Sequence, residues 1–403
     1  MIQFLTAGES HGKALTTIVE GFPSNLKINI DEINLQLKRR QSGYGRGLRM
    51  KIESDAVEIL SGIRFGKTLG SPVSMLIRNK DWENWADKMK IEGKSSGVEK
   101  ITIPRPGHAD LVGISKYNYN DIRNSIERSS ARETAARVAA CSIARIFLAE
   151  FGITIGSFVE SIGGVYPENN FAAKLFDNNL SKNFDAWGLS AKSDKSRVRV
   201  LESKHEKEII DKIKLAKKKG DTLGGTFYVV ATGVPVGLGT FVHYDKKLDA
   251  CIANSIMSIN AVKAVSIGTG FESSEKFGSE SHDEIVLKNN LLTRKTNRAG
   301  GIEGGISTGL PIIVRGAMKP ISTLMSPIES VDLKTMKKVD ARRERSDFVA
   351  VPACAVIGES MLAWTLAEFF VEKFGGDSIE ETKDNFSSYT RKLHSRIKKN
   401  FAK

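Results

Sequence analysis

The 403-residue sequence predicts an α+β fold in which helices are enclosed between antiparallel sheets. Segments of strand character outnumber the helical ones and are separated by glycine turns, whereas a doubly wound parallel sheet would alternate strands with helices. Three long, alanine-rich helical patterns have small residues on several faces, which indicates that they are covered on more than one side. Apolar residues make up 40% of the chain and charged residues 27%, as is typical of a soluble enzyme.

The predicted strands are short apolar runs bounded by turn residues. They are expected at 16–22, 57–63, 73–79, 154–166, 226–236 and 310–318. The helices are expected at 121–152, 248–268 and 352–376. Gly152 is a stop signal for the first helix, and Pro352 suits the first turn of the third, where its missing N–H costs no hydrogen bond.

No Ser/Gly/Pro-rich linker divides the chain. We therefore expect one domain over residues 1–375, followed by a charged tail over 376–403. The Asn-rich segment 169–185 is expected to be a peripheral insertion, and the lysine-rich tail a solvated surface.

The net charge of +13 and the pI of 9.4 favour an anionic partner: a nucleic acid, an anionic membrane or a multiply anionic small molecule. Five cations surround three glycines in the segment 38–50. Arginines on such a loop suit bidentate capture of carboxylate and phosphate. Tyr44 is the loop's only aromatic residue, so an RNA-binding pattern is absent there. These cations are Lys38, Arg39, Arg40, Arg46 and Arg49.

Several other classes of protein are disfavoured. Cys141, Cys251 and Cys354 are too widely spaced to indicate a disulfide framework or a zinc site. The first ten residues lack the basic and apolar regions of a signal peptide, and no apolar run approaches the ~18 residues of a membrane span. We expect a cytoplasmic enzyme that binds neither membrane nor nucleic acid and needs no metal.

Two motifs resemble known catalytic loops. Residues 8–12, GESHG, match the G-x-S-x-G nucleophile elbow, but only seven residues precede Gly8, too few for the strands that an elbow follows. Residues 62–68 resemble a phosphate-binding loop but have three residues between the glycines instead of four. No dinucleotide fingerprint follows a strand. A serine hydrolase acting through Ser10 and a basic nucleic-acid-binding protein remain the alternatives.

Two of the six histidines stand out. His11 and His108 lie on short turns of small residues, where an imidazole can face a ligand and exchange protons near neutral pH. Two histidines in lysine-rich segments are expected to be solvated, namely His205 and His394. Two beside acidic residues are expected to be structural hydrogen-bonding groups, namely His243 and His282.

Nine blocks, in order along the chain, closely resemble the chorismate synthase family. They are GESHG (8–12), RRQSGYGRGLRM (39–50), RPGHAD (105–110), ERSSARETAARVAA (127–140), DTLGG (221–225), GTGF (268–271), NRAGGIEGGISTGLPI (297–312), KPISTL (319–324) and RSDFVAVPA (345–353). The insertion near 169–185 and the tail depart from the family pattern, and neither overlaps a block.

The resemblance implies a β-α-β sandwich with central helices between antiparallel sheets, usually assembled as a homotetramer. It implies a lyase of the shikimate pathway that converts 5-enolpyruvylshikimate 3-phosphate to chorismate and phosphate by 1,4-anti elimination. Reduced FMN is the implied cofactor, although the reaction has no net redox change. The chain has no added nicotinamide motif, so we expect NADPH to act only indirectly, through a separate flavin reductase.

The resemblance also implies roles for individual residues. His11 is the implied acid at the leaving phosphate, His108 the group at the flavin N1–C2 edge, and Asp347 the acceptor of the flavin N5 proton. Ser10, Arg40, Arg46 and Arg49 are implied to face the substrate, and Arg40 and Arg46 are also associated with NADP in the family. The implied FMN contacts are Arg128, Ser129, Ser130, Asn260, Ala261, Gly304, Lys319, Pro320, Ile321, Ser322, Thr323 and Arg345.

Overall fold

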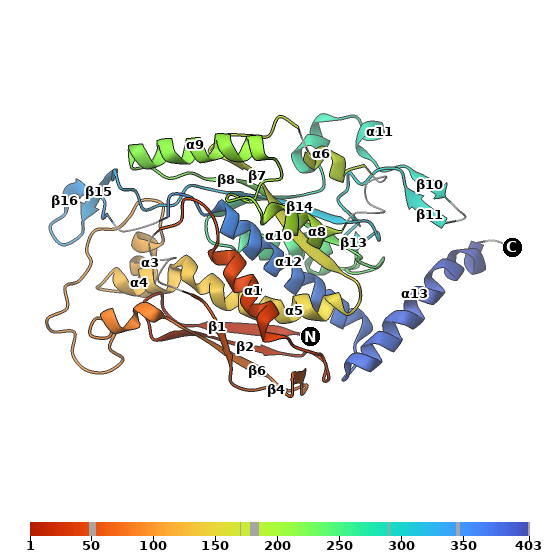
Figure 1. The fold of residues 1–403 in the computed structure, drawn as a ribbon, viewed down its shortest axis with the longest axis horizontal. Coiled ribbons are helices and arrows are strands. Elements are labelled where there is room, and N and C mark those ends of the chain that lie inside the picture. Colours follow the sequence, from red (N-terminus) through yellow and green to blue (C-terminus); the bar gives the residue numbers. More distant parts are fainter. Residues whose placement is uncertain (48–53, 170, 178–184, 289–290, 344–346, 402–403) are drawn as a thin grey trace.

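A layer of helices lies between two four-stranded antiparallel sheets (Figure 1). The computed structural model describes residues 1–47, 54–169, 171–177, 185–288, 291–343 and 347–401. The lower sheet has the order β1-β2-β6-β3 and the upper sheet the order β7-β8-β14-β9. This arrangement confirms the predicted α+β sandwich.

Six of the eight strands of the two sheets fall on segments predicted as strands; the first strand was not predicted, and the strand at 262–267 lies in a segment predicted to be helical. The lower sheet is built from β1 (Gln3–Ala7), β2 (Ala14–Glu20), β3 (Val57–Ile59) and β6 (Val73–Arg78). The upper sheet is built from β7 (Thr154–Ile162), β8 (Gly225–Thr232), β9 (Val262–Ile267) and β14 (Ile312–Met318). The predicted strand 57–63 is too long, because the chain leaves the sheet after Ile59 and enters a small hairpin, β4 (Ile63–Arg64) and β5 (Lys67–Thr68).

Three helices fill the space between the sheets: α1 (Ile30–Gln41), α5 (Thr134–Ala149) and α12 (Val351–Phe374). Helix α5 packs on β1, β2 and β6, whereas α12 packs on β7 and β8 and on α5. One apolar cluster runs through both sheets and these helices. Helix α12 is apolar and long enough to cross a membrane, but 89% of its apolar window is buried, as in the core helix of a soluble protein. The predicted helix 352–376 is thus confirmed.

The other two predicted helices need correction. The pattern 121–152 divides into α4 (Arg123–Ser129), a short 3-10 turn and α5, because Ser130 is extended and its side chain accepts a hydrogen bond from the Arg132 N–H. The pattern 248–268 is helical only in α10 (Leu248–Met257). Its second half is strand β9, in which β-branched residues pair with β14.

A buried carboxylate, Glu359 of α12, ties the helical layer to the upper sheet. Its oxygens accept hydrogen bonds from Arg39 at 2.7 and 2.8 Å, from Arg145 at 2.9 Å and from Arg199 at 3.1 Å. Burial alone would raise the pKa of Glu359, but the charges of Arg39 and Arg145 outweigh it and hold this pKa well below its usual value. Glu359 is therefore an ionised group inside the core.

The remaining elements lie around this sandwich. They are α3 (Asp110–Tyr117), α6 (Phe171–Leu175), α8 (Ala186–Ser193), α9 (Ser203–Lys219), α11 (Gly278–Ser281), α13 (Ile379–Phe401) and the hairpins β10 (Ile285–Lys288) with β11 (Leu291–Arg294), β12 (Ile302–Glu303) with β13 (Ile306–Ser307), and β15 (Glu329–Asp332) with β16 (Lys337–Asp340). The charged tail forms helix α13, which projects from the body in Figure 1 and is anchored by packing of Phe386 on Phe374 and Phe370.

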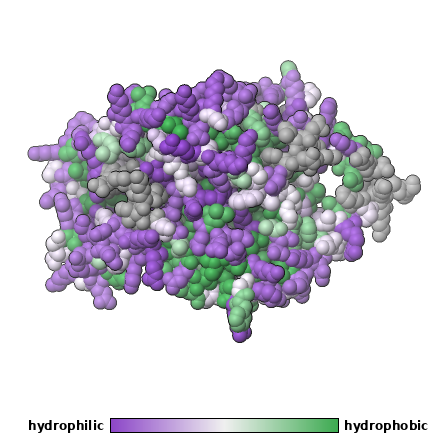
Figure 2. Space-filling view, in the orientation of Figure 1, coloured by the Kyte–Doolittle hydropathy of each residue, from purple (hydrophilic) through white to green (hydrophobic). Residues whose placement is uncertain are grey.

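The outer face of the lower sheet is partly apolar. Leu5 and Ile18 are cross-strand partners and are 69% and 47% exposed. Figure 2 shows apolar side chains gathered over the same side of the molecule, at the bottom of the view. Among the described residues, no helix of this chain covers that face of the sheet.

Candidate active site

His11 lies in the tight turn between β1 and β2. Gly8 has a φ of +115°, and a Cβ there would meet the Ala14 carbonyl oxygen at 2.5 Å, so only glycine fits. The Asn79 side chain, just after β6, donates to the Gly12 carbonyl at 2.7 Å and to the Glu9 carbonyl at 3.2 Å. This turn joins two strands and leads to no helix, so the nucleophile-elbow interpretation of GESHG is wrong.

A buried carboxylate orients the His11 ring. Both carboxylate oxygens of Glu127, on α4, lie 3.0 Å from His11 Nδ1, and the His11 backbone N–H donates to Glu127 Oε2 at 2.8 Å. The imidazole also stacks on the Trp85 ring at a centroid distance of 3.9 Å. Burial would raise the pKa of Glu127, but its hydrogen bonds with His11 and the charge of Arg123 outweigh burial and lower this pKa.

His108 is held in the same way at the start of α3. Its Nδ1 lies 2.5 Å from Oδ1 of Asp110, which is fully buried. Arg105 donates to Asp110 from its backbone N–H and from Nε, both at 2.9 Å. Burial would raise the pKa of Asp110, but the hydrogen bonds with His108 and Arg105 prevail and hold it well below its usual value.

Helix α4 brings the two histidines together. Its Glu127 binds His11, and its Ser125 hydroxyl donates to the Ala109 carbonyl, next to His108, at 2.9 Å. The packing of α3 on α4 is close, since a Cβ at Gly113 would meet the Ser125 hydroxyl oxygen at 2.0 Å. Two turns that are far apart in the sequence therefore meet at one seven-residue helix.

The implied FMN residues Asn260 and Ala261 lie between α4 and the segment after β14. The Asn260 side-chain amide donates to the Ser129 carbonyl at 3.1 Å, and the Lys319 N–H donates to the Ala261 carbonyl at 2.9 Å. Ala261 has a φ of +67°, a conformation that reverses the chain between α10 and β9. These contacts join three of the predicted segments.

Residues 319–323 bond to the His108 turn and so close a ring of contacts. This ring runs from α4 through residues 260–261 and 319–323 to the His108 turn and back to α4. The Lys319 ammonium donates to the Gly107 carbonyl at 2.5 Å, and the Ser322 hydroxyl donates to the same oxygen at 2.7 Å. Arg105 donates to the Thr323 hydroxyl at 3.1 Å. The Ile321 carbonyl accepts from Thr222 of the DTLGG block at 2.7 Å, and Pro320 lies beside Gly224 of that block.

Ser130, Ser10 and Arg128 make hydrogen bonds at the His11 turn. The Ser130 hydroxyl donates to the Ser10 hydroxyl at 3.1 Å, and Arg128 donates to the Thr6 carbonyl at 2.9 Å. The Ser129 side chain bonds back to its own helix at the Ser125 carbonyl. The block 127–140 thus contacts the β1–β2 region both from α4 and from Ser130, the residue at which the helical pattern is interrupted.

Arg40 and Arg46 join the arginine loop to the block 127–140 and to Asp347. Arg40 is buried and donates to Thr134 at 3.0 Å and to Asp55 at 3.2 Å, and burial lowers the pKa of its guanidinium to about 10. Arg46 pairs with Asp347 at 3.1 Å. The charges of Arg46 and Asp347 both act on Arg40. The predicted residues Arg49 and Arg345 lie outside the described residues.

Gly304 is not brought to this ring. It lies at the turn of the β12–β13 hairpin, where the Gly305 carbonyl accepts from the Leu248 N–H at the start of α10. Asn260 follows the other end of α10, and ten helical residues span about 15 Å. Within this chain, Gly304 therefore stands apart from the other predicted residues.

The sequence missed the carboxylates Asp110 and Glu127, the arginines Arg105 and Arg123, and Trp85. The His-x-Asp spacing within RPGHAD was the available signal for Asp110, whereas Glu127 and Trp85 meet His11 only through the fold. The expectation for His205 was wrong: it is 4% exposed on the inner face of α9, and its Nε2 lies 3.2 Å from the Val165 carbonyl. His243 is exposed and bonds to Asp245 at 2.6 Å.

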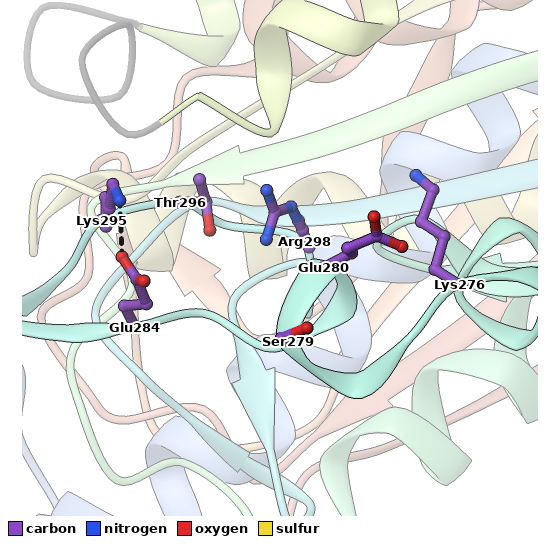
Figure 3. A pocket seen from close by; sticks show the side chains of 7 residues that line it. All are labelled: Lys276, Ser279, Glu280, Glu284, Lys295, Thr296 and Arg298. Carbon is purple, nitrogen blue, oxygen red and sulfur yellow. Dashed lines mark ion pairs between the residues drawn. The ribbon is translucent and has the colours of Figure 1, made fainter.

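Two pockets found among the described residues lie elsewhere. One has a volume of about 480 Å³ and opens beside α11 (Figure 3), where Lys295 pairs with Glu284 at 2.7 Å. The other, of about 280 Å³, adjoins it near Tyr228. No group of three or more potential metal ligands occurs within the part of the chain that the structure describes.

Comparison with known proteins gives the family of the chain. The family profile of chorismate synthase matches residues 2–371. The chorismate synthase of Chloroherpeton thalassium is 54% identical over 396 residues, covering 97% of this chain and 100% of the relative. That of Aquifex aeolicus is 52% identical over 397 residues, covering 98% of each. A crystal structure of chorismate synthase, 43% identical, superposes with a TM-score of 0.78 over 98% of each chain. The chain therefore belongs to the chorismate synthase family.

Proposed function

We propose that this protein converts 5-enolpyruvylshikimate 3-phosphate to chorismate and phosphate by 1,4-anti elimination, with reduced FMN as cofactor. The observation that supports this most directly is the pair of histidines, each bonded to a buried carboxylate: α4 binds His11 through Glu127 and bonds through Ser125 to the Ala109 carbonyl, next to His108. Family membership gives the coarser conclusion that the protein is a lyase of the shikimate pathway.

The charges around the histidines suit the substrate, which has two carboxylates and a phosphate. Arg128 bonds to the strand before the His11 turn, Lys319 bonds to the His108 turn, and Arg46 pairs with Asp347. Charge-assisted hydrogen bonds from such groups bind carboxylate and phosphate strongly. Arg40 is buried between Asp55 and Thr134, so we propose that it supports the loop from behind while Arg46 faces the substrate.

The residues present also fit FMN. Asn260 Oδ1 is buried and has no hydrogen-bond partner among the described residues, so it is an acceptor available to an N–H group of a ligand. Arg128 and Lys319 are suited to hold a phosphate, and Ser130 and Ser322 offer hydroxyls nearby. When bound, reduced FMN would supply the electron-donating and hydrogen-accepting chemistry of a reaction without net redox change.

The proposed role of His11 is proton donation to an oxygen of the departing phosphate, from the ring nitrogen that does not face Glu127. A positioned acid of this kind contributes roughly 10²–10⁴-fold to a rate. His108 is 22% exposed, and Lys319 donates to the carbonyl of the preceding Gly107; we propose that His108 donates to the edge of the flavin ring. Asp347, bonded to Arg46 and to the Gly47 N–H, is the proposed acceptor of a flavin proton.

We further propose a cytoplasmic homotetramer that receives its reduced flavin from a separate NADPH-dependent reductase. The apolar outer face of the lower sheet, with Leu5 and Ile18 exposed as partners, supports a self-associating surface. Mass measurement in solution tests the oligomer.

An anaerobic assay tests the proposed reaction. The full-length protein is mixed with 5-enolpyruvylshikimate 3-phosphate and dithionite-reduced FMN, and chorismate is followed by its absorbance. We expect turnover only when both are present. A His243→Ala variant, changed at an exposed histidine away from the ring, is the matched control and should retain the wild-type rate. Absence of chorismate with fully reduced FMN would overturn the proposal.

A further inference from the structure

We propose that Glu127 and Asp110 are positioning residues that fix which nitrogen of His11 and of His108 bears the proton and which way each ring faces. This inference deepens the proposed function and rests on it, because the two histidines are the proposed acids of the reaction. The two arrangements share one design, although they come from different segments of the chain.

In each arrangement a partly exposed histidine meets a buried carboxylate through Nδ1. Glu127 is 2% exposed and Asp110 is fully buried, whereas the side chains of His11 and His108 are 18% and 22% exposed. In each, the carboxylate also binds an arginine: Arg123 donates to Glu127 Oε1 at 3.1 Å, and Arg105 donates to both oxygens of Asp110.

The charge state of the carboxylates decides the proton on the rings. An ionised carboxylate only accepts hydrogen bonds. The low pKa values of Glu127 and Asp110 keep both ionised near neutral pH. In its contact with the carboxylate, Nδ1 of each histidine must therefore be the donor, and the remaining nitrogen, Nε2, is the one whose proton changes during a reaction. At His108 the Arg105 Nη2 also lies against the ring, 3.1 Å from Nδ1 and 3.4 Å from Nε2, so the shorter contact with Asp110, at 2.5 Å, is the one that selects the Nδ1–H form.

Other groups hold the His11 ring and set its surroundings. Trp85 stacks on the imidazole and fixes its plane, and the Arg123 guanidinium lies 4.8 Å from the centre of the Trp85 ring. Charged groups near His11 include Glu127 and Arg123 from α4, with Lys88 5.0 Å from the Trp85 ring. Charged groups near His108 include Asp110 and Arg105 from its own segment and Lys319 from the segment after β14.

The hydrogen bonds that Glu127 accepts indicate what its substitution by glutamine would remove. The two oxygens of Glu127 accept from three donors: the His11 backbone N–H, His11 Nδ1 and Arg123. Glutamine offers one oxygen and one NH₂ group, so in either orientation the NH₂ group points at a donor. E127Q therefore loses the single hydrogen-bonding pattern that selects the Nδ1–H form of His11 while changing the volume very little.

The experiment compares E127Q and D110N with E133Q in the full-length protein. Glu133 is a matched control because it is also buried and binds Arg137 and Thr6, but no histidine. The first measurement is the ¹⁵N NMR signature of the imidazoles without substrate, assigned with the histidine variants. We expect wild-type His11 and His108 each to show one Nδ1–H form. E127Q should change only His11, D110N only His108, and E133Q neither.

The second measurement separates kcat from KM. We expect E127Q and D110N to lower kcat by on the order of 10²-fold, within the worth of a positioned acid, with KM changed less than about threefold. A mixture of ring forms in the wild-type protein, or unchanged imidazole signals in both variants, would overturn the proposal. Because the NMR signature needs no substrate, a wild-type protein with the expected signature but no turnover would contradict the proposed function and leave this inference standing. If a variant does not fold, the wild-type spectrum still tests the proposal, because a mixture of imidazole forms at His11 or His108 would overturn it.

Discussion

Arg46 and Asp347 form an ion pair, with Arg46 Nη1 3.1 Å from Asp347 Oδ2, although 300 residues separate them in the sequence. The Gly47 N–H donates to the other oxygen of Asp347 at 2.5 Å, and the Phe348 N–H donates to the Gly45 carbonyl. The arginine loop is therefore fastened to the segment that precedes the central helix α12. A group proposed to bind substrate and a group proposed to accept a proton thus depend on each other for their positions.

Replacement of Arg46 should weaken substrate binding more than it slows turnover. We expect R46A to raise KM, because a charge-assisted hydrogen bond is worth about 1.5–3 kcal/mol. Steady-state kinetics with reduced FMN in excess measure the change. R64A is the control, since Arg64 is an exposed arginine stacked on Phe65, away from the ring of contacts. An unchanged KM for R46A would show that the loop faces solvent.

Loss of either histidine should slow the chemical step. We expect H11A and H108A to lower kcat by roughly 10²–10⁴-fold, which is the usual contribution of a positioned acid or base. Flavin titration should show that H11A binds FMN about as well as the wild-type protein does, because His11 faces Glu127 and Trp85 and makes none of the proposed flavin contacts. Near wild-type turnover in both variants would contradict the proton assignments.

Removal of the buried charge at Glu359 should destabilise the fold. E359Q leaves Arg39, Arg145 and Arg199 without their shared carboxylate, and breaking a buried ion pair costs about 3–5 kcal/mol. Urea unfolding at neutral pH measures the loss. E329Q, which removes an exposed ion pair with Lys338, should cost less than about 1 kcal/mol. Equal losses of unfolding free energy in E359Q and E329Q would contradict the prediction that the buried ion pairs of Glu359 stabilise the fold more than an exposed one does.

The same group predicts how stability depends on pH. The pKa of Glu359 in the folded protein lies well below its usual value of about 4.3. A carboxylate with a lowered pKa contributes stability that is complete above the unfolded-state pKa and is lost as pH falls through the folded-state pKa. The free energy of unfolding should therefore be higher for the wild type than for E359Q by a constant amount between pH 7 and about pH 5. This difference in free energy should become smaller as the pH falls further. A difference that widens on acidification would contradict this sign.

The source of reduced flavin gives a prediction of a different kind. With FMN and NADPH but neither oxygen nor reductase, the purified protein should form almost no chorismate, because the chain has no nicotinamide-binding motif. Addition of a flavin reductase or dithionite should restore turnover. Sustained turnover on NADPH alone would contradict the prediction and direct attention to Arg40 and Arg46.

Much of the fold was predictable because its core elements bury apolar runs of regular period. The strands 73–79, 226–236 and 310–318 and the helix 352–376 follow from such runs. The prediction of a single helix over 248–268 was wrong because β9 follows α10 after only four residues, so that one apolar stretch contains both a helix and a strand. The prediction that His205 is solvated was wrong because the lysines around it lie on the outer face of α9, whereas its own side chain lies on the inner face.

The site was predictable only in part. The resemblance indicated His11, His108 and the segment 319–323, and the structure brings these together through hydrogen bonds. The partners Glu127 and Trp85 were not predictable, since neither lies near His11 in the sequence and each meets it only after the β1–β2 turn, α4 and the turn after β6 converge. Gly304 remains a prediction that no contact within the chain brings to the ring.

The position of α12 between the two sheets has a consequence for biosynthesis. The helix occupies residues 351–374, so every strand of both sheets leaves the ribosome before the helix that separates them. Until then the inner faces of β7 and β8, which α12 covers in the finished protein, have no partner from this helix. The nascent chain therefore exposes apolar surface for most of its synthesis, the condition under which chaperones are needed most. Premature termination before residue 351 would leave a product prone to aggregate rather than a smaller folded protein.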